Sequence, residues 1–229
     1  MKRMTLTVLM VLAALAASRR GGLAFAPESP IRPESRVWFS GASNIRRFTC
    51  KARQVAGSID LRGTATAGTF LSGTNASHGP SLSVTVAKLD CGIGVMSGHL
   101  HEALLAPRYP TIEFRLATYE IDLHTAVPVA RITGWVKIAG VERAVTTPAT
   151  VRMDTLGRLH VIGTYAIRPT EFGVKPPRRF AGLLRVRDRT TVHFDVALDA
   201  DNAAIDDIAC ALHSTRALIG SPATYAPHS

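Results

Sequence analysis

The sequence holds few of the residue types from which catalytic and metal sites are built. It has 3 cysteines in 229 residues and no Cys-x-x-Cys, and it contains neither Gly-x-Ser-x-Gly nor His-Glu-x-x-His. These absences disfavour thiol–disulfide catalysis, a serine hydrolase with a nucleophile elbow and a helical zinc protease. Acidic residues are also scarce, at 17 against 27 Lys and Arg. We therefore expect no enzyme, and a hydrolase ranks third among the functions considered.

Beyond the N-terminus the chain also lacks any apolar run of about 18 residues, the length that spans a bilayer. The N-terminal run Met4–Ala17 follows Lys2 and Arg3 and rises only about 21 Å as a helix. It therefore predicts a secretory signal rather than an anchor. We place this signal in residues 1–26. Cleavage after Ala17 and after Ala24 both stay open, because Pro27 opposes a cut after Ala26.

Export would change the charge of the mature chain. Removal of Lys2, Arg3, Arg19 and Arg20, with no acidic residue before Glu28, lowers the formal net charge from +10 to +6. A modest basic surplus on an exported protein favours an anionic lipid surface of the envelope as partner over nucleic acid. We expect the location to be the periplasm or the extracellular space.

The cysteines fit an oxidising compartment, where two of the three are expected to pair. Cys50 and Cys91 lie within the body of the chain, whereas Cys210 lies in the tail. We predict a Cys50–Cys91 disulfide, which would stabilise the fold by about 4 kcal/mol in the chain-entropy model, less any strain.

The period of apolar residues changes twice between Ser81 and Tyr119. Leu82, Val84 and Val86 alternate with polar residues, then Met96, Leu100 and Leu104 recur every fourth residue, and alternation resumes at Ile112, Phe114 and Leu116. This pattern predicts a short helix inserted between strands. Further strands are expected at Arg36–Ser40, Cys50–Leu61, Gly63–Ser72, Val129–Ala139, Val145–Met153, His160–Ile167, Gly182–Asp188 and Thr190–Leu198.

Short turns join most of these strands, with hairpin connections expected at Gly140–Arg143 and Leu156–Arg158. The fold class is therefore all-β, as an antiparallel barrel or sandwich over residues 27–199. Pattern alone does not separate the two, because both need one apolar face. We favour a lipocalin-like β-barrel, which can hold an elongated ligand inside. Residues 200–229 form a tail with an expected helix at Ala203–Leu218, either docked on the barrel or partly ordered.

Four stretches together resemble the YceI-like family of exported, lipocalin-like barrels that bind polyisoprenoid lipids. They are SRVWFSGASNIRRFTCKA, GHLHEALLAPRYPTIEF, ITGWVKIAGVERAVTTPATV and YAIRPTEFGVKPPRRFAGLLRVRDRTTVHFDVAL, and they cover roughly Ser35 to Leu198. The resemblance implies a binding protein with no cofactor other than a bound lipid, such as a quinone tail or a polyprenyl group. The second candidate function is a secreted structural or stress-response barrel without lipid, and the third is a hydrolase of envelope components.

If the barrel binds lipid, its lumen should be lined by the apolar strand faces and closed at one end by the helix. The residues expected there are Val37, Phe39, Val84, Val86, Met96, Leu100, Leu104, Phe114, Val136 and Phe194.

Two groups of polar residues suggest a binding site but also have a simpler explanation. His99 and His101 lie two residues apart on the expected helix, about 200° around its axis, so they do not share a metal ion and no metal site is expected. Lys175, Arg178 and Arg179 crowd a proline-bearing loop, where they either hold an anionic headgroup at the barrel mouth or simply face water. Aromatic residues do not interleave with these charges, which disfavours nucleic acid.

Overall fold

The computed structural model describes residues 29–59, 61–66, 70–75, 79–123, 125, 127–175, 178–179, 184–199, 208 and 210. The predicted signal, residues 1–26, and nearly all of the tail, residues 200–229, lie outside the described residues. Within the described part, no helix has the length and apolar character needed to cross a membrane.

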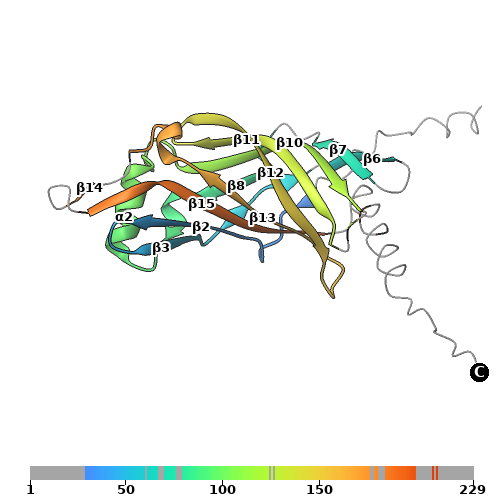
Figure 1. Ribbon diagram of the computed structural model, residues 1–229, viewed down its shortest axis with the longest axis horizontal. Helices are drawn as coiled ribbons and strands as arrows, with labels where there is room; N and C mark the ends of the chain where they lie inside the picture. Colours follow the sequence, from blue (N-terminus) through green and yellow to red (C-terminus); the bar gives the residue numbers. More distant parts are fainter. Residues whose placement is uncertain are drawn as a thin grey trace, which may run out of the picture.

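The described chain is built from strands that pair antiparallel throughout, with one α-helix (Figure 1). The elements in order are β1 Ser29–Pro30, β2 Arg36–Ser43, β3 Arg47–Ala52, β4 Val55–Ala56, β5 Ser58–Ile59, β6 Leu61–Thr66, β7 Phe70–Asn75, β8 Leu82–Thr85, a 3-10 turn Val86–Lys88, β9 Leu89–Asp90, α2 Gly94–Ala103, β10 Thr111–Asp122, β11 Val129–Ile138, β12 Val141–Met153, β13 Leu159–Ile167, a 3-10 turn Pro169–Phe172, β14 Arg178–Arg179 and β15 Leu184–Leu198.

One segment joins the two margins of the main sheet. The strand order runs β4-β8-β10-β11-β12-β13-β15-β2-β3-β9. β8 pairs with β10 through Thr85 and Thr111, while β9 pairs with β3 through Asp90 and Lys51. Because β8 and β9 are parts of the same segment, the sheet curls round and meets itself. The prediction of an antiparallel lipocalin-like barrel with one short inserted helix is confirmed.

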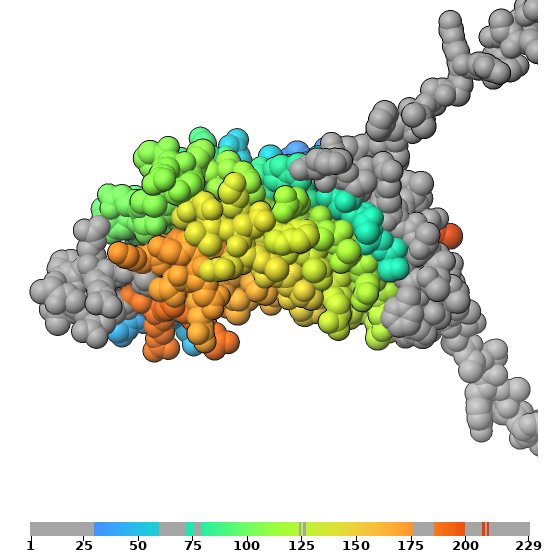
Figure 2. Space-filling model, turned by 90° about the horizontal axis from the view of Figure 1, so that it is seen from above, coloured from blue at the N-terminus to red at the C-terminus, as the bar shows by residue number. Residues whose placement is uncertain are grey.

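The barrel is elongated, and its two ends differ (Figure 1). One end, the helical end, carries α2, the turn between β2 and β3, and the start of β15. In the space-filling view the green surface of α2 and the orange surface of the Pro169–Phe172 turn and β15 lie at this same end (Figure 2). The opposite end, the far end, is where β13 begins and β15 finishes, at the paired residues Leu159 and Leu198.

The structure departs from the predicted elements where the backbone breaks its alternation. The expected Cys50–Leu61 strand is divided into β3, β4 and β5, and the hairpin turn lies at Ala139–Gly140, with β12 beginning directly at Val141. Ala139 and Gly140 both have positive φ, of 47° and 82°, as a two-residue type I′ hairpin turn requires. The two last predicted strands are one strand, β15, with a register shift between Val186 and Thr190.

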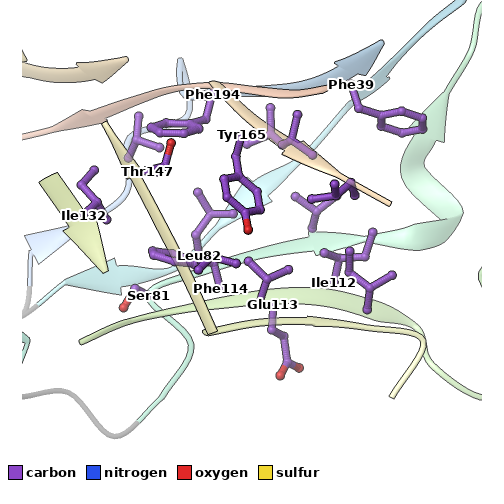
Figure 3. A pocket seen from close by; sticks show the side chains of 18 of the residues that line it. Phe39, Ser81, Leu82, Ile112, Glu113, Phe114, Ile132, Thr147, Tyr165 and Phe194 are labelled. Carbon is purple, nitrogen blue, oxygen red and sulfur yellow. The ribbon is translucent and has the colours of Figure 1, made fainter. Parts of the chain in front are cut away.

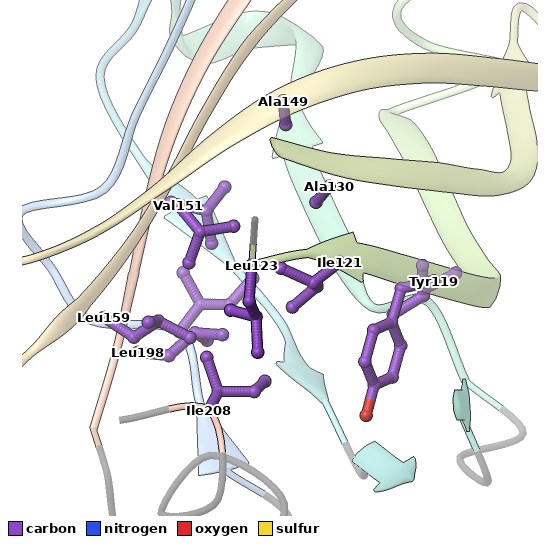
Figure 4. Packing of buried hydrophobic residues seen from close by; sticks show 12 residues of the cluster. Tyr119, Ile121, Leu123, Ala130, Ala149, Val151, Leu159, Leu198 and Ile208 are labelled. Atoms are coloured by element: carbon purple, nitrogen blue, oxygen red, sulfur yellow. The ribbon is translucent and has the colours of Figure 1, made fainter. Parts of the chain in front are cut away.

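Buried side chains form two clusters, one toward each end. The far-end cluster includes Ile121, Val151, Leu159, Leu198 and Ile208 (Figure 4). The helical-end cluster includes Val84, Leu89, Leu104, Phe172 and Val174, so it joins α2 to the segments that precede and follow it. A substantial apolar area is thus removed from water at both ends, which is the main stabilising contribution to such a fold.

The predicted Cys50–Cys91 disulfide is confirmed, with a sequence separation of 41 between its two cysteines. It ties β3 to the loop that leads into α2, next to the antiparallel pair of Lys51 and Asp90. Cys210 is exposed and lies outside this bridge.

Candidate functional site

The barrel encloses a cavity of about 330 Å³ whose lining is almost wholly apolar. Side chains reach it from β2, β8, β10, β11, β12, β13, β15 and α2, and Figure 3 shows them converging on a common space. Its volume falls within the range of about 300–1,000 Å³ that is typical of ligand sites.

Strand alternation explains why the lining is apolar. In the ladder formed by β13, β15 and β2, Tyr165 lies opposite Val192 and Val192 lies opposite Phe39, and all three face the cavity. Residues at intervening positions, such as Trp38 and His193, stack on each other with ring centroids 5.2 Å apart and do not line the cavity. In this ladder alternate residues therefore face the lumen, and the residues between them face outward.

Eight of the residues expected in the lumen line this cavity: Val37, Phe39, Val84, Leu100, Leu104, Phe114, Val136 and Phe194. Val86 and Met96 do not. Val86 opens the 3-10 turn after β8, so the alternation that placed it with Val84 ends there, and it is buried in the helical-end cluster instead. Met96 is half-buried in the first turns of α2, whereas Leu100 and Leu104 contact the lumen from the later part of that segment.

Three phenylalanine rings lie against glycines on neighbouring strands. A Cβ atom on Gly41 would stand 2.5 Å from Cζ of Phe48, and one on Gly163 would stand 2.4 Å from Cζ of Phe194. A Cβ atom on Gly134 would likewise stand 2.7 Å from Cε2 of Phe114. Because glycine has no side chain, each ring lies close to the wall and leaves the centre open. These contacts depend on the register between strands, so they could not be predicted from the sequence.

The two ends of the cavity are closed to different degrees. At the far end the lining residues Leu159, Leu198 and Ile208 are only 2%, 2% and 1% exposed (Figure 4). At the helical end the lining includes half-buried Phe48 and exposed Arg187. From these more exposed lining residues we infer that the mouth of the cavity lies at the helical end.

The surface around the mouth combines apolar and basic side chains. Ile45, in the β2–β3 turn, and Val95, in α2, are 72% and 70% exposed. Arg46 and Arg47 follow Ile45 directly, and Lys175 is exposed directly after Val174 of the helical-end cluster. Of the predicted headgroup residues, Arg178 and Arg179 form β14 against the start of β15; their side chains lie outside what the structure describes.

Most polar side chains in the lining already have partners inside the protein. Ser81 Oγ accepts hydrogen bonds from the Leu116 amide and from Asn75 Nδ2, each at 3.0 Å. Thr147 Oγ1 donates to the Thr164 carbonyl at 2.9 Å. The Tyr165 hydroxyl has no hydrogen-bond partner among the described residues, and Figure 3 shows it pointing into the cavity.

The histidines serve other contacts. His101 Nε2 lies 2.9 Å from the Leu89 carbonyl oxygen, which fastens α2 to β9. His160 Nδ1 lies 2.7 Å from Asp195 Oδ1, near Asp154. In the described ranges, no three His, Cys, Asp or Glu side chains are grouped so as to hold a metal ion.

Asp154 belongs to an ion-pair network beyond the cavity, in the β12–β13 turn. Its carboxylate accepts hydrogen bonds from the backbone amides of Arg158 and Leu156 at 2.9 and 2.8 Å. The pKa of Asp154 is lowered to about 2, mainly by the hydrogen bond from the Arg158 amide and next by the hydrogen bond from the Arg158 guanidinium. Arg158 also pairs with Glu34, so the turn is fastened to the segment before β2.

Comparison with known proteins agrees with this geometry. A family model for the YceI-like domain matches residues 33–198. Among solved structures, the chain is similar to BcnA of Burkholderia cenocepacia, at 15% identity and a TM-score of 0.50, covering 72% of this chain and 96% of that chain. It is also similar to a polyisoprenoid-binding domain of Saccharophagus degradans, at 13% identity and a TM-score of 0.52, covering 75% and 98%. At such identities the two structures support the fold alone. No curated protein matches the chain.

Proposed function

This chain belongs to the YceI-like family, and we propose that it is an exported, non-enzymatic binding protein that holds an isoprenoid or similar amphiphilic lipid in its barrel. The observation that supports this proposal most directly is the apolar cavity of about 330 Å³. The polyisoprenoid-binding domain of Saccharophagus degradans, which is similar in fold, supports an isoprenoid as the class of ligand.

The physical chemistry of the lumen suits a long hydrocarbon chain. Each methylene that leaves water for an apolar cavity contributes about 0.8 kcal/mol. Affinity can therefore accumulate along the chain with few polar contacts, and it needs no sequence motif. The ligand would contact Val37, Phe39, Phe114, Val136 and Phe194 along the walls, with Leu100 and Leu104 of the α2 segment beside the mouth.

The polar end of such a ligand would meet the basic surface at the mouth. Lys175 is exposed there, and Arg178 and Arg179 follow it in β14. An arginine guanidinium matches the oxygens of a phosphate or carboxylate in a bidentate manner. The same surface, with exposed Ile45 and Val95, would rest on an anionic lipid layer of the envelope while the ligand is exchanged.

Export is supported by the N-terminal segment and by the disulfide. Met4–Ala17 has the composition of a signal peptide. The Cys50–Cys91 bridge is the kind of crosslink that persists in oxidising compartments. A periplasmic or extracellular location is consistent with both.

The proposal is tested by native mass spectrometry and solvent extraction of the full-length protein purified from its own envelope, where a co-purifying isoprenoid is expected. Val136→Phe places a ring in the lumen and should abolish that ligand, whereas Lys137→Phe places the same ring on the exposed position next to it and should not. A ligand-free protein that takes up no lipid after incubation with envelope extract would instead favour a barrel without lipid.

A further inference from the structure

Resting on the proposed lipid-binding function, we propose that the ligand carries a neutral oxygen atom, as a hydroxyl or carbonyl group, that hydrogen-bonds to the Tyr165 hydroxyl inside the lumen. Tyr165 would then be the residue that selects an oxygen-bearing amphiphile over a plain hydrocarbon of the same length.

Tyr165 lies on the inner face of β13, in the middle of the barrel wall. It is opposite Val192 in the ladder, and Val192 is opposite Phe39, so its immediate neighbours on the wall are apolar. Figure 3 shows its ring crossing the lumen, with the hydroxyl directed toward Leu82 and Phe114 on the opposite wall. Neither of those side chains can accept or donate a hydrogen bond.

The hydroxyl lacks a partner in the part of the chain that the structure describes. The nearby polar lining residues do not supply one, because Ser81 and Thr147 are engaged elsewhere. Glu113 accepts a hydrogen bond from Thr111 Oγ1 at 2.9 Å, and its carboxylate points away from the hydroxyl of Tyr165 (Figure 3). Thr190, two pairs further along the β13–β15 ladder toward the mouth, also lines the cavity, and its hydroxyl has no hydrogen bond to any described residue.

This arrangement penalises a purely hydrocarbon ligand. Such a ligand would fill the lumen, exclude water and leave the hydroxyl buried without a partner, which is unfavourable for any polar group. A ligand with an oxygen at this depth would satisfy the hydroxyl instead. Sites built to hydrogen-bond a ligand oxygen discriminate against the analogue that lacks it for this reason.

The buried oxygen should be neutral. Arg187 is the one cationic residue among the described lining residues, and it is exposed in the register-shifted part of β15. A phosphate or carboxylate beside Tyr165 would therefore be desolvated without a counter-charge. An isoprenoid alcohol or a quinone ring fits this position, whereas an anionic headgroup belongs at the mouth beside Lys175 and Arg187.

The test compares two probes that differ by one oxygen: phytol, an isoprenoid alcohol, and phytene, the hydrocarbon with the same carbon skeleton and degree of unsaturation. Their affinities are measured by native mass spectrometry titration for the wild type, Tyr165→Phe and the control Thr147→Val. Thr147→Val removes a lining hydroxyl that is already bonded to a backbone carbonyl. We expect Tyr165→Phe to weaken phytol binding about five- to tenfold and to leave phytene binding unchanged or tighter. Thr147→Val should affect both probes equally.

Two outcomes would overturn the inference, and they differ in what they say of the barrel. If Tyr165→Phe binds both probes as the wild type does, the lumen binds lipid but Tyr165 selects nothing. If the wild type binds neither probe, the proposed function itself fails and the inference fails with it.

Discussion

The Gly41–Phe48 contact offers a direct way to change the volume of the lumen. Gly41 of β2 is paired with Phe48 of β3, and a Cβ atom on Gly41 would stand 2.5, 3.0 and 3.2 Å from three ring carbons of Phe48 and meet nothing else as close. Gly41 does not have a positive φ, so alanine fits its backbone. The change Gly41→Ala therefore acts on the ring rather than on the main chain.

The size of the effect follows from these distances. Ordinary contact begins at 3.4 Å, so the ring edge must move at least 0.9 Å away from β2, toward the cavity that it lines. If this movement displaces one or two methylene groups of the ligand, at about 0.8 kcal/mol each, affinity falls about four- to fifteenfold. The free energy of unfolding should change little. Gly→Ala lowers the conformational entropy of the unfolded chain, which stabilises the fold by about 0.4–1 kcal/mol and offsets part of the cost of crowding the Phe48 ring.

The assay is native mass spectrometry titration with phytol and phytene, with thermal unfolding measured in parallel. Gly79→Ala is the matched control, since a Cβ atom there would have nothing within 4 Å. A crystal structure of Gly41→Ala should show the Phe48 ring shifted into the lumen. If the ring shifts and the affinity still equals that of Gly79→Ala, the glycine–phenylalanine contacts do not set the capacity of the lumen.

Three further predictions concern stability and the mouth. The pKa of Asp154 is lowered to about 2 in the folded protein, so the contribution of its carboxylate to stability is present above about pH 4 and is lost as the pH falls toward the folded pKa. Asp154→Asn should therefore lower the melting temperature at pH 6 and reduce the decrease in melting temperature between pH 6 and acid. An unchanged decrease would contradict this. Replacing Cys50 and Cys91 together by alanine should destabilise the protein by up to about 4 kcal/mol, measured by denaturant unfolding, and equal stability of the oxidised and reduced wild type would count against it. Replacing Arg46 and Arg47 by glutamate should weaken binding to phosphatidylglycerol vesicles more than tenfold, at about 1 kcal/mol for each basic residue, as measured by co-sedimentation. Arg152→Glu, at an exposed position in β12, should not weaken it. Equal losses of binding would argue against the mouth as the contact surface.

The sequence predicted the fold well wherever apolar periodicity acts locally. Met96, Leu100 and Leu104 marked the α2 segment, and the alternation around Phe114, Val136 and Phe194 marked strands whose inner faces line the cavity. The prediction failed where the backbone changes conformation but the alternation of apolar residues does not. Val86 continues the apolar alternation of β8 but starts a 3-10 turn, and the register shift after Val186 made β15 read as two strands.

The hollow interior could not be predicted from the apolar pattern of the strands. Pattern along one strand cannot separate a filled sandwich from an open barrel, because both need one apolar face. In this barrel Gly41, Gly134 and Gly163 lie against phenylalanine rings of neighbouring strands, and these contacts depend on register. Each glycine on its own would suggest only a weak point in a strand.

The same dependence on register explains why the ligand-selecting group was invisible in the sequence. Tyr165 sits among Thr164, Ala166 and Ile167 in an unremarkable strand, and nothing in that order marks its hydroxyl as unsatisfied. Only the ladder places it opposite Val192 and across from Leu82 and Phe114, where no described residue completes its hydrogen bond. Glycines that remove side chains from the wall set how much ligand fits, and a tyrosine left without a partner sets which ligand is preferred. Capacity and selectivity would therefore respond to different substitutions, Gly41→Ala acting on both probes and Tyr165→Phe on the alcohol alone.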